Sequence, residues 1–128
     1  MAVHGDDGMD EISVCAGTRV VEIDESGKRR DYTLSPEEFG IPRFTTADLH
    51  GANAADNARV AEEILHGAGP AAMREAVLLN AGAAVYLSGL ERNIGDGYLR
   101  ARAALAAGTA FAKLEEIRAH ARRAGAAA

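Results

Sequence analysis

The segment from Pro70 to about Ser88 most constrains how this 128-residue chain can fold, because apolar side chains cover nearly its whole circumference. The apolar positions are Val77, Leu78, Leu79, Ala81, Ala83, Ala84, Val85 and Leu87. A helix that is apolar on all sides has to be buried on several of them. We therefore expect a central helix here, opened by Pro70 and surrounded by other elements.

The rest of the chain offers little material to cover such a helix. Its apolar residues comprise 28 alanines, one cysteine and 32 larger side chains. Alanine buries little area, and burial stabilises a fold by only about 25 cal/mol per Å². Most of the alanines follow residue 51, where they favour helix. We expect an oligomer or a larger parent protein to complete the core.

The first half of the sequence predicts strands, turns and loops. Thr18–Ile23 and Lys28–Leu34 read as the two strands of a hairpin, and the turn residues of Asp24–Gly27 lie between them. Ser35–Glu38 has the pattern of a short helix start. Val3 is expected to end a further strand.

The second half predicts four helices. The first has Asp56 as its N-cap and ends near His66, and the apolar helix from Pro70 follows. The third is marked by Tyr98, Ala101 and Leu105, and the fourth by Ala110, Leu114, Ile117 and Ala121. We expect one partial α/β domain over residues 1–128, with a strand and loop region at 1–55 and a helical region at 56–128.

Charge and composition exclude several classes of protein. The net charge is −5, and it is split between −8 in residues 1–64 and +3 in residues 65–128. With few aromatics and no dense basic patch, the chain is not expected to bind nucleic acid. It has no apolar run long enough to span a membrane. A single cysteine, Cys15, suits a reducing compartment, so we expect the cytoplasm.

The segment His4–Glu11, here called the acidic loop, is the strongest candidate for chemistry. It places four carboxylates, those of Asp6, Asp7, Asp10 and Glu11, within six positions. Mg²⁺ prefers one or two such carboxylates together with waters and substrate phosphates. The adjacent Asp10 and Glu11 can both point outward from a loop, whereas a strand would send them to opposite faces. The alternative is a solvated turn in which Asp10 only caps a helix.

Two other side chains are weaker candidates. His4, beside these acids, could act as a base or a metal ligand, although a lone histidine more often has a structural hydrogen-bonding role. Cys15 lies in an apolar segment and reads as a small core residue. The sequence has no Ser/His/Asp arrangement, no paired-cysteine zinc pattern and no phosphate-binding glycine loop. We assign no catalytic and no cofactor-binding residue.

The acidic loop, with Val3 before it, resembles the "VHG-x-DG-hydrophobic-DE" segment of the anthranilate phosphoribosyltransferase family. Further similar segments follow in the family's order: Tyr32–Gly40, Gly51 with Asn57-Ala58, Ile64–Gly67, Leu78–Tyr86, Gly95–Ala103 and Gly108–Leu114. The resemblance covers essentially the whole chain, but only the C-terminal third or slightly more of the family's length. It implies part of a nucleoside-phosphorylase-like α/β domain, with short strands or a hairpin followed by about four helices.

The resemblance also implies a function. The family transfers the phosphoribosyl group of phosphoribosyl pyrophosphate to the amino group of anthranilate in tryptophan biosynthesis. Its adjacent Asp-Glu binds Mg²⁺, which carries over to Asp10 and Glu11 and would stabilise the departing pyrophosphate. Because the family is usually dimeric, we expect a homodimer or association with the missing N-terminal portion.

The departures from the family pattern matter as much. The glycine-rich "GTGGD" loop, the "KHGN" segment, the arginine that helps hold anthranilate and the N-terminal helices are all missing. His4 does not correspond to the "KHGN" histidine, because its neighbours differ. Asn57 and Asn80 match recurring asparagines, for which we predict helix capping and interhelical hydrogen bonds. We hypothesise that Met1 is an internal methionine of a longer reading frame and that the chain is inactive alone.

Two other functions compete with this one. A non-catalytic, alanine-rich helical interaction module would behave the same, Mg²⁺ binding included, after Asp10→Ala and Glu11→Ala. A related nucleoside phosphorylase is a third possibility, but the uninterrupted match from Asp10 through Asn80 favours the anthranilate enzyme.

Overall fold

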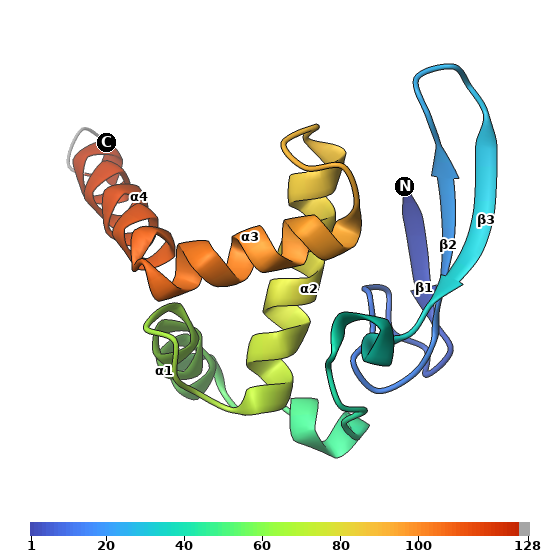
Figure 1. The fold of residues 1–128 in the computed structure, drawn as a ribbon. Coiled ribbons are helices and arrows are strands. Elements are labelled where there is room, and N and C mark those ends of the chain that lie inside the picture. The colour runs from blue at the N-terminus through green and yellow to red at the C-terminus, as the bar shows by residue number, and fades with distance from the viewer. Residues whose placement is uncertain (126–128) are drawn as a thin grey trace.

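The computed structural model describes residues 1–125, so the last three residues of the predicted helical region lie outside it. In chain order its elements are β1 (Ala2–Gly5), β2 (Thr18–Ile23), β3 (Arg29–Leu34), the short 3₁₀ turns η1 (Pro36–Phe39) and η2 (Thr46–Leu49), α1 (Ala54–Leu65), α2 (Ala71–Leu87), α3 (Ile94–Ala106) and α4 (Thr109–Gly125). The strands lie on one side of α2, and α3 crosses α2. Helices α1 and α4 lie on the side of α2 away from the strands (Figure 1). Within the described residues, no helix combines the length and hydropathy needed to cross a membrane.

The strands form an antiparallel sheet in the order β1-β2-β3. The predicted hairpin of β2 and β3 is confirmed, and the strand expected to end at Val3 extends to Gly5 and pairs with β2. In the register Val3 lies opposite Val20, which lies opposite Tyr32. Alternation along β2 buries Thr18, Val20 and Glu22, whereas Arg19 and Ile23 are exposed and Val21 is half-buried.

The helices begin and end close to the predicted positions, with one correction. Pro70 is the N-cap of α2, so the predicted start of the apolar helix is confirmed. The N-cap of α1, however, is Asn53 rather than Asp56. The Asn53 Oδ1 accepts the backbone N–H of Asp56 at 3.0 Å, and the Asp56 carboxylate accepts the Asn53 side-chain amide at 2.7 Å. Both residue types cap well, and the extended backbone at Asn53 decides between them.

Helices α2 and α3 touch at a pair of glycines. A Cβ atom on Gly97 would lie 2.1 Å from the carbonyl oxygen of Gly82, and one on Gly82 would lie 2.5 Å from the backbone nitrogen of Tyr98. Only glycine at both positions allows the two backbones to approach this closely. The crossing therefore depends on the absence of two side chains.

The core lies between α2, α3 and the loops that follow β1 and β3. Ile12, Val14 and Ile41 from the loops pack there with Val20 from the sheet and Leu79 from α2. Each of these side chains is at most 2% exposed.

One part of α2 lies outside this core. Val77 is 48% exposed and Leu87 is 54% exposed. The expectation that α2 is buried on several sides is therefore wrong for these positions within this chain. The reason is that the sheet, its loops and α3 cover only part of the circumference of the helix.

Candidate functional site

The acidic loop leaves β1 through a tight backbone turn. The N–H of Gly5 donates to the carbonyl of Met9 at 2.8 Å, and the N–H of Gly8 donates back to the carbonyl of Gly5 at 2.9 Å. Gly8 has φ +91°, a left-handed conformation that a residue with a side chain rarely adopts. The turn also joins the start of β2, because the N–H of Asp6 donates to the carbonyl of Gly17 at 2.8 Å.

The four carboxylates of the acidic loop have different surroundings. Asp7 is engaged within the fold: its Oδ2 accepts the hydroxyl of Ser13 at 2.6 Å and its Oδ1 accepts the N–H of Met9 at 3.3 Å. The Ser13 hydroxyl in turn accepts the N–H of Cys15 at 2.9 Å. Asp7 is thus a structural residue, so the four acids do not act as one ligand cluster.

Asp10 and Glu11, here called the acidic pair, are both exposed. Neither side chain has a hydrogen-bond or ion-pair partner among residues 1–125. The backbone directly after them is held: Ile12 is 2% exposed, and both its N–H and its carbonyl bond to the side chain of Asn80 on α2. The acidic pair therefore presents uncommitted carboxylates on an anchored segment.

The two exposed carboxylates of the acidic pair suit Mg²⁺ better than structural zinc. Nowhere in residues 1–125 do three or more His, Cys, Asp or Glu side chains gather in a way that could enclose a metal ion. A site that supplies all its ligands from protein, as structural zinc does, is not formed by these residues. Two carboxylates facing solvent suit Mg²⁺, which keeps several waters and takes further ligands from substrate phosphates.

The other candidates from the sequence lie as follows. His4 is exposed on the outward face of β1, opposite Arg19 in the register. Cys15 is half-buried against the core, and burial, with the nearby charge of Asp7 added, raises the pKa of its thiol. A raised pKa disfavours the reactive thiolate, which agrees with the prediction of a packing residue.

The two asparagines act on loop backbone. The side chain of Asn57 on α1 accepts the N–H of Ala52 at 2.8 Å and donates to its carbonyl at 3.3 Å. Asn80 bonds Ile12 in the same way and also bonds Ala76 of its own helix. The helix capping and interhelical hydrogen bonds predicted for these two asparagines are therefore wrong. An amide inside an otherwise apolar helix was the sequence signal for such a contact.

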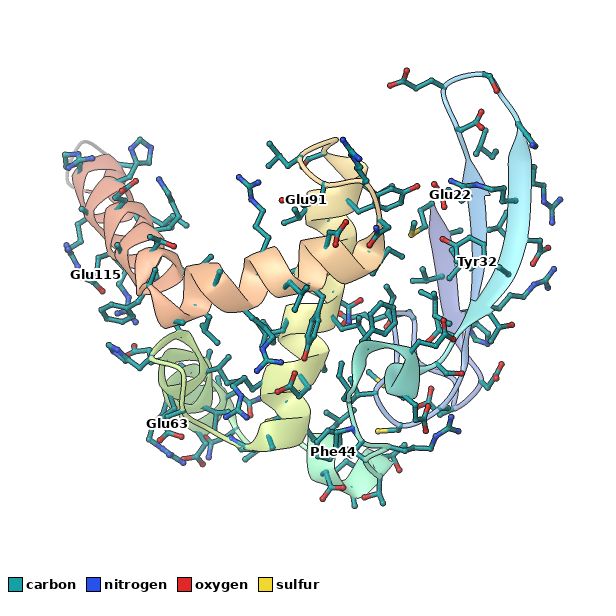
Figure 2. All side chains as sticks on the ribbon, viewed as in Figure 1. Glu22, Tyr32, Phe44, Glu63, Glu91 and Glu115 are labelled. Carbon is teal, nitrogen blue, oxygen red and sulfur yellow. The ribbon has the colours of Figure 1, made fainter. Side chains whose placement is uncertain are left out.

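A second carboxylate site was missed entirely by the sequence analysis. Glu22 of β2 is 5% exposed and lies at the centre of the Glu22 cluster, which also contains Arg30, Tyr32 and Tyr86. Its carboxylate accepts the hydroxyls of Tyr32, at 2.8 Å, and of Tyr86, and pairs with Arg30 at 2.8 Å. Figure 2 shows Glu22 and Tyr32 on the side of the sheet nearer to α2. The cluster ties the hairpin to the C-terminal end of α2.

The titration of the Glu22 cluster reflects these contacts. Burial acts to raise the pKa of Glu22, but the two tyrosine hydroxyls and the charge of Arg30 outweigh it, so the pKa lies below its ordinary value. Burial and the neighbouring Glu22 carboxylate raise the pKa of Tyr32 to about 12. The cluster therefore holds a charged Glu22 and neutral tyrosines near neutral pH.

A family model described as "glycosyl transferase family, a/b domain" matches residues 1–111. The chain belongs to this family. Its curated relatives include the anthranilate phosphoribosyltransferase of Rubrobacter xylanophilus, 41% identical over 117 residues, a match that covers 91% of this chain and 34% of the relative. The chain thus spans about a third of the length of the curated relatives that it matches.

Solved structures of anthranilate phosphoribosyltransferases share this fold. The anthranilate phosphoribosyltransferase of Thermus thermophilus aligns with a TM-score of 0.76 and 38% identity, over 89% of this chain and 33% of that one. The Saccharomyces cerevisiae enzyme in complex with PRPP and Mg aligns with a TM-score of 0.77 and 28% identity, over 88% of this chain and 32% of that one. The resemblance stated from the motifs and the expected α/β fold are both confirmed.

Proposed function

We propose that this chain is part of a Mg²⁺-dependent anthranilate phosphoribosyltransferase and contributes the acidic pair, Asp10 and Glu11, as metal ligands. Two observations together support the proposal: the chain belongs to the family, and the acidic pair is exposed and, within the described residues, without protein partners on an anchored backbone. A solved relative is described in complex with PRPP and Mg, the phosphoribosyl donor and the cation that such a site would serve.

The residues fit this role through charge. When bound, Mg²⁺ supplies positive charge to the pyrophosphate group that leaves phosphoribosyl pyrophosphate. Asp10 and Glu11 would hold the ion from one side and leave its other positions open to phosphate oxygens and water. Without a cation, the two carboxylates would repel the same substrate, because both carry negative charge.

We further propose that the active protein contains a second portion, on this chain or on a partner, that supplies the remaining substrate contacts. The chain spans about a third of its relatives' length, and the motifs for pyrophosphate and anthranilate are missing from it. Val77 and Leu87 leave apolar surface uncovered, and β1 is an edge strand of the sheet. Such a surface and such an edge are ordinary places for further structure to pack.

A chimera tests the proposed function directly. Residues 1–125 of this chain replace the matching third of the Rubrobacter xylanophilus enzyme, and formation of phosphoribosyl anthranilate is measured against Mg²⁺ concentration. We expect Mg²⁺-dependent product, and a loss of about 100-fold or more in the matched variant with Asp10→Asn and Glu11→Gln. A folded chimera that yields no product at saturating Mg²⁺ contradicts the proposal. Unchanged Mg²⁺ binding in the double variant would instead support the helical interaction module.

A further inference from the structure

The acidic pair lies on a short span of chain that is fixed at both ends. Before it, the backbone of Met9 makes two hydrogen bonds. Its carbonyl accepts the N–H of Gly5 at 2.8 Å, and its own N–H donates to the Asp7 carboxylate. After it, Ile12 is fully buried in the core. Only two residues, Asp10 and Glu11, therefore separate the two fixed points.

The fixed point after the pair depends on one side chain. The Asn80 Oδ1 accepts the N–H of Ile12 at 2.9 Å, and its Nδ2 donates to the carbonyl of Ile12 at 3.0 Å and to the carbonyl of Ala76 at 3.0 Å. An asparagine amide has two donor hydrogens and one carbonyl oxygen, so all of its groups are used. Exchanging its oxygen and nitrogen would place donor against donor, which fixes the orientation of the amide.

Local structure gives no reason for an asparagine at this position. Asn80 lies in the middle of α2 between Leu79 and Ala81, where alanine or leucine would form a better helix. Ile12 is 68 residues away along the chain, so the benefit of Asn80 comes from a tertiary contact. That contact ends one residue beyond the proposed metal ligands.

We infer that Asn80 is a positioning residue for metal binding: it holds the backbone at Ile12 so that the acidic pair is already ordered when Mg²⁺ arrives. This inference rests on the proposed function of Asp10 and Glu11. Fixing backbone before the ligand binds removes an ordering penalty from the binding step. Residues that orient metal ligands typically change metal affinity by roughly 10- to 100-fold when they are removed.

The chain contains a matched control. Asn57 on α1 bridges the N–H and the carbonyl of one loop residue, Ala52, just as Asn80 bridges those of Ile12. The residues next to Ala52 are not proposed as ligands. Asn57→Ala and Asn80→Ala therefore remove the same kind of bridge, but only the second removes it beside the acidic pair.

The experiment measures Mn²⁺ binding, as a spectroscopic probe of the Mg²⁺ site, in the presence of pyrophosphate, together with thermal unfolding. The proteins are the parent chain, Asn80→Ala, Asn57→Ala, and Asp10→Asn with Glu11→Gln. We expect Asn80→Ala to weaken Mn²⁺ binding about 10-fold and Asn57→Ala to change it less than about twofold. A merely structural role would lower the midpoint of unfolding without separating the two asparagine variants in metal affinity.

The outcomes distinguish this inference from the proposed function. If the parent binds Mn²⁺ through the acidic pair and Asn80→Ala binds it equally well, the positioning role is wrong and the proposed function stands. If the parent chain does not bind Mn²⁺, the positioning role is wrong, and the chimera still decides the proposed function. If the parent binds Mn²⁺ equally well without the two acids, both are wrong.

A second measurement covers the case in which Asn80→Ala does not fold. Hydrogen exchange of the Ile12 amide is followed in the metal-free parent chain. Prior ordering predicts strong protection, little changed by Mn²⁺ with pyrophosphate. Exchange as fast as that of the exposed turn residue Ser26 would overturn the inference.

Discussion

The acidic loop and the Glu22 cluster both place carboxylates beside the same sheet, and the surroundings of those carboxylates are opposite. Glu22 is buried and receives hydrogen bonds from Tyr32, Tyr86 and Arg30. Asp10 and Glu11 are exposed, and the structure's described residues supply neither with a partner, although the backbone after them is anchored. In one region the side chain is fixed, and in the other only the main chain is.

The difference separates two uses of negative charge. A carboxylate whose hydrogen bonds are all made within the protein contributes to stability and has little left to offer a ligand. A carboxylate on an anchored backbone, with no partner of its own, contributes little to stability and is available to a cation. Changes at the two regions should therefore be detected by different measurements.

The largest effect should come from neutralising the acidic pair. Asp10→Asn with Glu11→Gln removes both proposed ligand charges, so Mn²⁺ affinity of the chain in pyrophosphate should fall by about 100-fold or more. The free energy of unfolding should change by no more than about 0.5 kcal/mol, because no side-chain hydrogen bond or ion pair within the described residues is lost. Titration calorimetry measures the Mn²⁺ affinity, and urea unfolding measures the stability. A large loss of stability with unchanged Mn²⁺ binding would mean that the acidic pair stabilises the fold and does not bind the cation.

Glu22→Ala should show the opposite pattern. It leaves the hydroxyls of Tyr32 and Tyr86 without their acceptor, so the free energy of unfolding should fall by about 2–3 kcal/mol. Metal binding by the acidic pair should persist in the folded protein. Glu25→Ala, in the exposed hairpin turn, is the control and should change stability by less than about 0.5 kcal/mol. Equal effects of the two substitutions in urea unfolding would show that the Glu22 cluster contributes nothing.

Acid should reduce the contribution of Glu22. Its pKa is lower in the folded chain than in the unfolded one, where a glutamate titrates near about 4.3. The stabilisation is therefore fully present above that unfolded value and is lost as the pH falls through the folded value. We expect the stability difference between the parent and Glu22→Gln, measured by urea unfolding, to be largest near neutral pH and to shrink below pH ~4. A difference independent of pH would argue against a charged Glu22.

The smallest effect should follow Arg30→Met. Arg30 pairs with Glu22, but half of its side chain is exposed to water. Solvent weakens such a pair, so the free energy of unfolding should fall by at most about 1 kcal/mol. Thermal unfolding of the parent and the variant, in low and in high salt, measures this loss of stability. A loss as large as that for Glu22→Ala would mean that the ion pair, rather than the tyrosine hydroxyls, stabilises the cluster.

Local patterns in the sequence were enough to predict the hairpin and the four α-helices, whereas the 3₁₀ turn η2 was not predicted. The alternation of Thr18–Ile23 and the apolar run after Pro70 both correspond to the elements found. The position of the α1 cap was not predictable, since Asn53 and Asp56 are both good capping residues and only backbone geometry distinguishes them.

The candidate site was only partly predictable from the sequence. Which carboxylates have protein partners depends on contacts between residues that can be far apart in the chain. Asp7 and Asp10 look alike in the sequence, yet Ser13 engages only Asp7. Glu22 has the appearance of a polar strand residue, and nothing nearby in the chain indicates that Tyr86, 64 positions later, lies against it. The metal-binding role of Asp10 and Glu11 remains a prediction.

The glycine contact between α2 and α3 has a consequence for the acidic loop. Gly82 lies two residues beyond Asn80 in α2. The same stretch of α2 therefore contacts the backbone of α3 at Gly82 and bonds the backbone of Ile12 through the side-chain amide of Asn80. A methyl group at position 97 would have to push α2 and α3 apart, and any shift of α2 would carry the Asn80 amide with it. The helical layer thus sets the alignment of the loop that bears the acidic pair.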